Sequence, residues 1–144
     1  MSLSKGKDFS TKHGPDEKPD PSVKNEILEQ TKNKKIPCAA AFEIAAVLQV
    51  SPMTVGKTAD LMNFKLIKCQ LGLFGYQPQK KIVKPQDSIK EDIKNAVSRA
   101  LGQGRLSCKD AWDIASRLNV SKMTVSSACE TMGVKIKNCQ LGAF

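Results

Sequence analysis

The strongest constraint on this chain is an internal repeat. Residues 23–74 align with residues 93–144 without a gap, so that position 23 matches position 93 and position 74 matches position 144, and 19 of these 52 positions are identical. The identical positions are spread along the whole segment and include apolar, polar and glycine residues. A match of this kind indicates two copies of one structural unit, so the question of the fold concerns one short unit rather than the whole chain.

The repeat divides the chain into four parts. We expect a disordered tail over 1–20, a first helix-turn-helix repeat over 21–76, a linker over 77–87 and a second repeat over 88–144. The tail is rich in Lys, Asp, Ser, Gly, Thr and Pro and has no apolar periodicity. The linker contains Pro78 and Pro85, which favours an extended segment. One short strand is expected within it, over residues 81–83.

The composition is that of a basic globular chain. Twenty-three Lys and Arg against 14 Asp and Glu give a formal net charge of +9, and such a field attracts polyanions without specifying a fold. The longest apolar runs, 38–42 and 44–48, are five residues each, far below the roughly 18–20 residues that span a bilayer. We therefore expect no membrane helix. Because the first residues are polar and lack an apolar signal segment, we expect a cytoplasmic location.

Apolar periodicity and capping residues predict three helices in each copy. The first helix begins near Pro21 in one copy and at Ser88 in the other, where Ser88-Ile89-Lys90-Glu91 matches a capping box. The second helix carries an apolar stripe that recurs in both copies, formed by Ala41, Ile44, Ala45 and Leu48 and by Ala111, Ile114, Ala115 and Leu118. Ser51 and Ser121 are placed to cap the third helix.

Short extended segments complete each copy. We expect them at 35–37 and 105–107, before the second helix. Apolar and basic residues alternate over 64–68 and 134–138, which predicts a half-exposed strand after the third helix. Each copy then has the order helix, short strand, helix, turn, helix, strand.

A repeated motif surrounds the turn between the second and third helices. It combines a small residue, two apolar anchors, a cap and an apolar residue of the third helix: Ala45, Leu48, Val50, Ser51 and Val55, and Ala115, Leu118, Val120, Ser121 and Val125. This motif and the element order resemble the winged-helix branch of the helix-turn-helix superfamily. The resemblance implies a mainly α fold, a tandem duplication of a winged-helix-like unit arranged as a pseudo-dimer. The chain departs from the family at Gln49 and Asn119, where the turn often has glycine, and the second copy, which ends at Phe144, is expected to lack a returning wing strand.

The resemblance also implies double-stranded DNA as a partner, with the third helix in the major groove. The residues then expected at DNA are Ser51, Met53, Thr54, Lys57, Lys65, Lys68, Ser121, Lys122, Met123, Thr124, Ser126, Ser127, Lys135 and Lys137. The outer face of this helix is a poor reader of base sequence, because it lacks Arg, Asn and Gln and carries Asp60 or Glu130. Affinity dominated by phosphate contacts is therefore expected.

Each copy ends in the same terminal string, Cys-Gln-Leu-Gly-x-Phe, at 69–74 and 139–144. A wing that enters a DNA groove is expected to be polar, whereas this string is mostly apolar, so we expect it to pack on the other copy. Phe42 and Trp112 lie at equivalent places and either pair across a pseudo-two-fold axis or widen the core of their own copy. The expected inter-repeat interface consists of Phe42, Leu71, Phe74, Trp112, Leu141 and Phe144.

Four cysteines, Cys38, Cys69, Cys108 and Cys139, stand at equivalent positions in the two copies. Four thiolates could hold zinc or an iron-sulfur cluster. The two cysteines within each copy are far apart in the chain, however, and lack the close Cys pairs typical of such sites. We therefore expect reduced, buried thiols and no cofactor or metal, with a thiol-based metal or redox sensor as a less favoured alternative.

No catalytic constellation is evident, so we do not expect an enzyme. The single histidine, His13, lies in the segment expected to be disordered, and no Gly-rich phosphate loop is present. The predicted function is that of a small transcriptional regulator that binds DNA through two tandem helix-turn-helix units, as a monomer with internal pseudo-symmetry or a homodimer. The alternative is a non-catalytic protein-protein interaction or assembly module, in which the third-helix methionines contact a protein.

Overall fold

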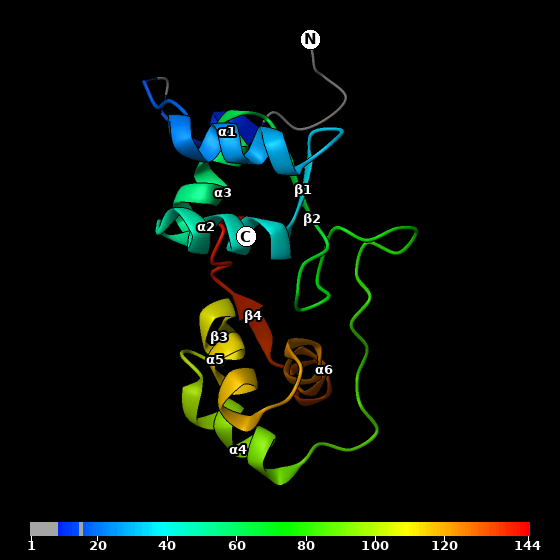
Figure 1. Cartoon of the computed structure of the whole chain (residues 1–144). Helices are drawn as coiled ribbons and strands as arrows, with labels where there is room; N and C mark the ends of the chain where they lie inside the picture. The colour runs from blue at the N-terminus through cyan, green and yellow to red at the C-terminus, as the bar shows by residue number, and fades with distance from the viewer. Residues whose placement is uncertain (1–8, 15) are drawn as a thin grey trace. The chain divides into compact units, whose positions relative to one another are not determined.

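The computed structural model describes residues 9–14 and 16–144, which form a mainly helical protein (Figure 1). A short 3-10 helix, η1 (Phe9–Lys12), comes first. Five elements follow in each repeat: α1 (Pro21–Gln30), β1 (Lys35–Pro37), α2 (Cys38–Leu48), α3 (Pro52–Leu61) and β2 (Lys65–Ile67), then α4 (Glu91–Ala100), β3 (Arg105–Ser107), α5 (Cys108–Leu118), α6 (Lys122–Met132) and β4 (Lys135–Lys137). The predicted mainly α class is confirmed, and the two repeats have the same element order.

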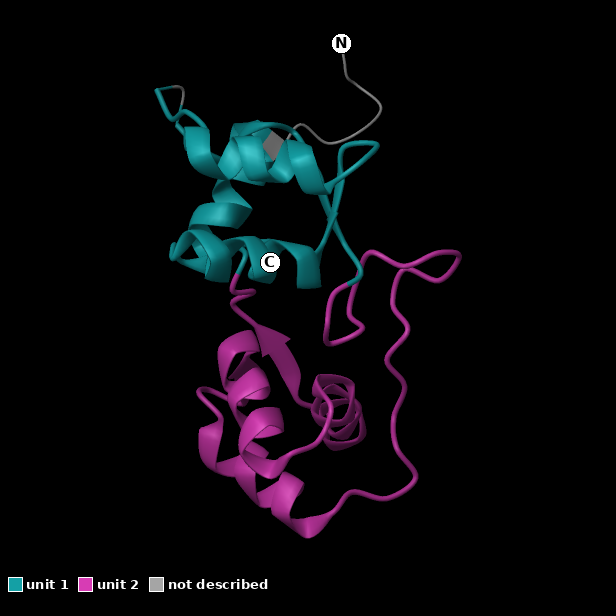
Figure 2. Ribbon diagram, in the orientation of Figure 1, with its two compact units in different colours: residues 1–68, 141–143 teal, residues 69–140, 144 magenta. Residues whose placement is uncertain are grey.

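The chain forms two compact units whose boundaries do not coincide with the repeats (Figure 2). Unit 1 contains Met1–Lys68 together with Leu141–Ala143, and unit 2 contains Cys69–Gln140 together with Phe144. The terminal string of the first repeat is therefore built into unit 2, and three residues of the second string are built into unit 1.

Side-chain caps start most of the helices where the sequence predicts them. The Asp20 side chain accepts a hydrogen bond from the backbone N–H of Val23 at 3.1 Å, and the helix begins with Pro21, whose missing N–H costs nothing there. Ser107 caps α5 in the same way by accepting from Asp110. These caps satisfy N–H groups that have no partner within the helix.

The capping box predicted at Ser88 is wrong. Helix α4 begins at Glu91, and its N-cap, Lys90, makes no side-chain hydrogen bond to the first turn. Glu91 and Asp92 lie in that turn instead, where their negative charges interact favourably with the positive end of the helix dipole.

The short strands form one parallel pair in each unit. In unit 1 the register places Ile36 opposite Leu66, and in unit 2 it places Leu106 opposite Ile136. Ile36, Leu66 and Leu106 are buried. Parallel pairing requires a crossover between the strands, and the two helices α2 and α3, or α5 and α6, provide it. The predicted strands over 64–68 and 134–138 are confirmed in their central residues.

The core of unit 2 includes a residue from the first repeat. Leu71 is fully buried in one apolar cluster with side chains of α4, β3, α5 and α6, among them Ile93, Val97, Leu106, Ile114 and Val125. The equivalent side chains of unit 1, Val23, Ile27, Ile36, Ile44 and Val55, are also fully buried. Each such burial contributes about 1.5–3 kcal/mol, so the first terminal string is part of the folded core.

The expected disordered tail is corrected for residues 9–14 and 16–20. Phe9–Lys12 form η1, and the segment is held to α3 by Asp60, whose carboxylate lies 3.1 Å from Lys12 Nζ and 3.0 Å from His13 Nε2. Asp60 is only 4% exposed, and a buried carboxylate needs such partners. The remaining residues of this prediction, 1–8 and 15, lie outside the described residues.

The strand expected over 81–83 in the linker is also wrong. The backbone N–H groups of Ile82 and Val83 both donate to the carbonyl of Gly72, at 2.9 and 3.1 Å. They therefore bind a turn of the first terminal string rather than a neighbouring strand.

No single helix among the described residues is long and apolar enough to cross a membrane. Helices α2 and α3 reach the required length and composition only when taken together, across a bend of 117°.

The turn after α2 is built on a strained residue. Gln49 is the C-cap of this helix with a φ of 56°, and Asn119 is its equivalent after α5, also at 56°. Left-handed backbone costs a side-chain-bearing residue about 1–2 kcal/mol, and asparagine tolerates it better than glutamine.

We predict that Gln49→Gly stabilises the protein by about 0.5–1 kcal/mol, because relief of this strain exceeds the extra unfolded-state entropy of glycine. Asn119→Gly is the matched control and should gain less. Urea unfolding of the three proteins measures both changes. A lower stability of Gln49→Gly than of the wild type would contradict this explanation of the turn.

Candidate nucleic-acid interface

The third helices, α3 and α6, start with hydroxyl groups that are engaged within the helix. Ser51 Oγ accepts from the Thr54 N–H at 3.1 Å and lies 2.9 Å from Thr54 Oγ1. Ser121 and Thr124 repeat this pair at 3.0 and 2.7 Å. All four residues are among the predicted DNA contacts, and their hydroxyls here stabilise the first turn of each helix.

The outer face of α3 is covered by other parts of unit 1. A side chain at Gly56 would collide with the backbone of Leu141, so the terminal string lies directly on this helix. Met53 lies beside Gly142, with its sulfur 3.0 Å from the position of a Cβ on that glycine. Lys12, from the segment before α1, contacts both the terminal string and α3. Its ammonium donates to the Gly142 carbonyl at 2.8 Å and pairs with Asp60.

The predicted DNA contact Lys57 forms an ion pair within unit 1. Its ammonium lies 2.9 Å from the carboxylate of Glu17, and the hydrogen bond and charge of Lys57 lower the pKa of that carboxyl group. One predicted phosphate contact is therefore already neutralised by the segment that precedes α1.

The outer face of α6 is covered in the same manner within unit 2. Met123 lies against Gly72 of the first terminal string, and Ser127 donates a hydrogen bond to the carbonyl of Lys84 in the linker. Lys81 pairs with Glu130 at 2.9 Å. Ser126 is 1% exposed, and among the described residues its hydroxyl has no hydrogen-bond partner.

The segments that cover α3 and α6 come from corresponding positions of the two repeats. Lys12, His13 and Glu17 contact α3, and Lys84 and Gln86 contact α6. The alignment of the two repeats, extended toward the N-terminus, places 12–14 onto 82–84, 16–17 onto 86–87 and Asp60 onto Glu130. In each unit a lysine of the preceding segment, Lys12 or Lys81, pairs with this acidic group. Part of the expected reading face is thus covered by protein in both repeats: Gly56 and Ser126 are buried, and Asp60 and Glu130 pair with lysines of their own unit. Met53, in contrast, is 51% exposed.

Lys122, predicted at the start of the second reading helix, lies over an aromatic ring. Its ammonium is 4.4 Å from the centre of the Trp112 ring, a cation–π distance. Trp112 therefore contacts α6 within unit 2. The pairing of Trp112 with Phe42 stays a prediction.

The basic strand surfaces carry exposed side chains of the predicted site, except Lys137, which is half-buried and donates to the Gly102 carbonyl at 3.5 Å. We define that of unit 1 as Lys34, Lys35, Lys65 and Lys68, and that of unit 2 as Arg105, Lys135 and Lys137. The register pairs Lys35 with Lys65 and Arg105 with Lys135. The β-strand prediction identified Lys65, Lys68, Lys135 and Lys137 but missed Lys34, Lys35 and Arg105. The signal for the pairs was the occurrence of basic residues at positions 35/105 and 65/135 of both copies.

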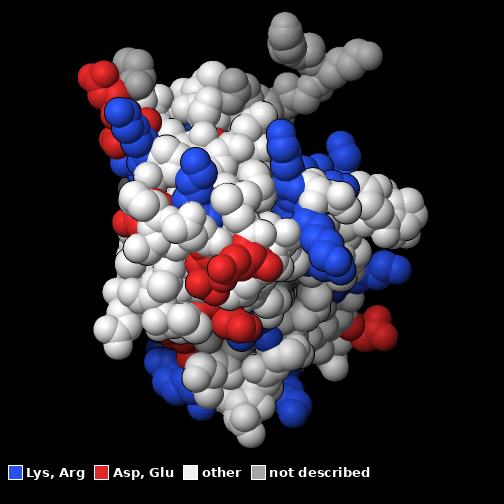
Figure 3. Space-filling model, turned by 45° about the horizontal axis from the view of Figure 1, so that its top comes forward, with Lys and Arg blue, Asp and Glu red and all other residues white. Residues whose placement is uncertain are grey.

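These surfaces concentrate positive charge without an internal counter-charge. Neighbouring strands lie about 4.8 Å apart, and like charges directly opposite each other on adjacent strands destabilise the pair. Within residues 9–14 and 16–144, no salt bridge neutralises any of the seven basic side chains. Figure 3 shows Lys and Arg side chains spread over the visible surface, some of them directly beside acidic side chains. A bound anion would relieve this repulsion.

The terminal strings fold back on themselves and supply aromatic contacts to unit 2. The Cys69 N–H donates to the Phe74 carbonyl at 3.1 Å, and Cys139 repeats the bond to Phe144 at 3.0 Å. The rings of Phe74 and Phe144 meet edge to face with centroids 6.0 Å apart. Leu71 and Leu141 are buried. Of the six residues expected at the inter-repeat interface, Leu71 and Leu141 are thus buried, and Phe74 contacts Phe144, which is 46% exposed.

The five cysteines are buried thiols. Burial raises the pKa of Cys69 and of Cys108, and it raises the pKa of Cys129 to about 11. Cys108 also accepts a hydrogen bond from Gln140 at 3.5 Å. In the part of the chain that the structure describes, no three His, Cys, Asp or Glu side chains are placed to hold a metal ion.

Comparison with known proteins identifies no relative for this arrangement: no family model matches the chain, and neither a curated protein nor a solved structure matches it significantly.

We predict that Gly56→Ala destabilises the protein by about 1–3 kcal/mol. Alanine in a helix interior is about 1 kcal/mol more favourable than glycine, but the added methyl group would overlap the Leu141 backbone. Gly102→Ala is the control, because only the flexible Lys137 ammonium lies near its Cβ position, at 3.7 Å. Chemical denaturation measures both variants. A stabilised Gly56→Ala protein would show that Leu141 is not seated on α3.

We predict slow alkylation of the native thiols at pH 8. A pKa of about 11 for Cys129 leaves about a thousandth of this group as thiolate, and the thiolate is the reactive form. Mass spectrometry after iodoacetamide treatment should find Cys129 unmodified in the native protein and all five cysteines modified in urea. Rapid labelling of native Cys129 would contradict its burial.

Proposed function

We propose that this chain is a small DNA-binding regulator that contacts duplex DNA through its two basic strand surfaces rather than through its third helices. The proposal keeps the architecture expected from the sequence, two tandem winged-helix-like helix-turn-helix units related as a pseudo-dimer. It assigns the role of the DNA contact to a different part of each unit.

The observation that carries the proposal is the register of basic residues on the paired strands. Lys35 lies opposite Lys65 in unit 1, and Arg105 lies opposite Lys135 at the same place in unit 2. All four side chains are exposed. A pair of like charges that costs stability and occurs twice is readily explained by an anionic partner, because phosphate groups along a nucleic-acid backbone neutralise several such charges at once.

The contacts made by the third helices also argue for binding that is dominated by phosphate contacts rather than by base readout. Base reading in the major groove needs side chains that are free to reach base edges. Lys57 and Ser127 instead contact other segments of their own unit. The proposed complex therefore has little direct base readout, and its affinity falls steeply with salt.

The alternative, a protein-protein interaction or assembly module, also has a specific observation in its favour. Both third helices already bind protein segments, and the methionines lie against glycines of the terminal strings. A scaffold that uses this helix for its own peptide segments can use it for another protein. Absence of DNA binding by the wild-type protein at about 50 mM salt would favour this module.

We predict that Lys35→Gln combined with Lys65→Gln weakens binding to all duplexes and lowers the slope of log K against log salt by about 1 for each lost phosphate contact. Lys24→Gln combined with Lys94→Gln removes the same number of charges from exposed helix positions and is the control. Fluorescence anisotropy at two or more salt concentrations gives both quantities.

Equal losses in the two double variants would mean that net charge alone attracts DNA, and the assignment to the strand surface would then fail. A variant of Arg105 and Lys135 to Gln tests the second surface in the same way.

A further inference from the structure

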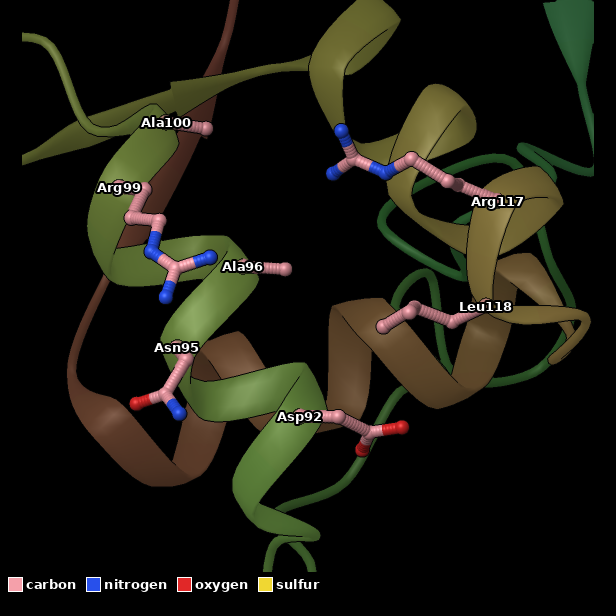
Figure 4. Close-up of a pocket in the computed structure, with 7 residues that line it drawn as sticks. All are labelled: Asp92, Asn95, Ala96, Arg99, Ala100, Arg117 and Leu118. Atoms are coloured by element: carbon pink, nitrogen blue, oxygen red, sulfur yellow. The ribbon is translucent and has the colours of Figure 1, made fainter.

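A hollow of about 580 Å³ lies between α4 and α5 of unit 2. Figure 4 shows Ala96 and Ala100 pointing from α4 toward the space into which Arg117 and Leu118 extend from α5. Asp92 and Arg99 complete the charged rim. The volume falls within the range of about 300–1,000 Å³ typical of small-molecule sites.

The rim carries two guanidinium groups and one carboxylate. No ion pair or hydrogen bond to the side chain of Arg99 or Arg117 is present among the described residues, so their planar donors are available. A guanidinium group binds carboxylate or phosphate oxygens through two parallel hydrogen bonds. The floor of Ala96, Ala100 and Leu118 is apolar, which suits the body of an organic molecule.

The first repeat provides an internal comparison. The alignment of the two repeats puts Glu29 at the place of Arg99 and Val47 at the place of Arg117, and it puts Glu26 and Gln30 at the places of Ala96 and Ala100. In unit 1 the last two side chains are longer and are hydrogen bonded to each other at 2.5 Å. The small floor and the two arginines therefore belong to the second repeat alone.

Helix electrostatics alone does not account for the two arginines. Each lies in the last turn of its helix, where a positive charge is favourable. The equivalent helices α1 and α2 have no basic residue in the last turn, yet they have the same lengths as α4 and α5. A basic residue in the last turn is consequently not needed to form a helix of this length in this fold.

We infer that this hollow is a binding site for a small organic anion, in which Arg99 and Arg117 hold a carboxylate or phosphate group and Ala96, Ala100 and Leu118 contact an apolar body. None of the residues that line it belongs to the basic strand surface of unit 2. It gives unit 2 a ligand-binding property that unit 1 lacks.

The test is an NMR titration of the full chain with benzoate, phenyl phosphate and, as a neutral analogue, benzyl alcohol. Saturable shifts of the Arg99 and Arg117 side-chain N–H signals and of the Leu118 methyl groups are expected with one or both anions, and much weaker shifts with the alcohol. A carboxylate source is indicated if benzoate binds more tightly, and a phosphate source if phenyl phosphate does.

Arg99→Glu combined with Arg117→Val installs the residues of the first repeat and should weaken anion binding by about tenfold or more, equivalent to about 1.4 kcal/mol. Lys94→Glu combined with Lys109→Val makes the same change of charge on the same two helices and should leave binding unchanged. Binding that both double variants reduce equally, equal binding of the alcohol, or no shift with either anion would overturn the inference.

A parallel titration with duplex DNA tests whether the hollow instead belongs to a nucleic-acid surface. If DNA alone shifts the Arg99 and Arg117 signals, the hollow is part of a nucleic-acid surface and the small-anion site is refuted. Because wild-type titrations decide these points, they hold even if the Arg99 and Arg117 double variant fails to fold.

Discussion

The contact between a terminal string and a third helix determines how the rest of this protein can work. In unit 1 the backbone of Leu141 approaches α3 so closely that only glycine fits at position 56. In unit 2 Leu71 of the first string is fully buried in the apolar core. The strings are therefore structural parts of the units, and the helices on which they lie have lost much of their outward surface.

This arrangement explains the roles of the charged residues on and near the third helices. Asp60 is repelled by DNA phosphates if it faces a groove, but it stabilises unit 1 when it faces Lys12 and His13. Glu130 has the same relation to Lys81 in unit 2. The acidic residue that made the third helix a poor base reader in the sequence is thus explained by its contacts within the unit. The strand lysines have no acidic partner among the described residues, so their positive charges remain available to an anionic partner.

Local sequence signals predicted most of the fold. The internal repeat, the apolar stripes around Ile44 and Ile114, and the caps Ser51 and Ser121 correctly indicated the helices, since these signals act within a few residues. The parallel pairing of β1 with β2 and the binding of Lys12, His13 and Glu17 to α3 could not be predicted in this way. Both depend on contacts between residues far apart in the chain.

The candidate site was predicted in composition but not in position. Alternation identified Lys65 and Lys135, whereas Lys35 and Arg105 became relevant only through the register of the strands. The resemblance to winged-helix proteins directed attention to the third helix, and a general family pattern contains no information about segments such as 81–86 that cover it here. The hollow beside Arg99 and Arg117 was missed because its two walls come from different helices.

The most direct test of the account is a backbone NMR map of the full chain titrated with a short duplex at low salt. The account predicts that the largest amide shifts occur at residues 34–35, 65–68, 105 and 135–137, while the amides of α3 and α6 change little. Large shifts confined to residues 52–60 and 122–130 would contradict it, because the third helices would then have to leave their coverings and enter the DNA.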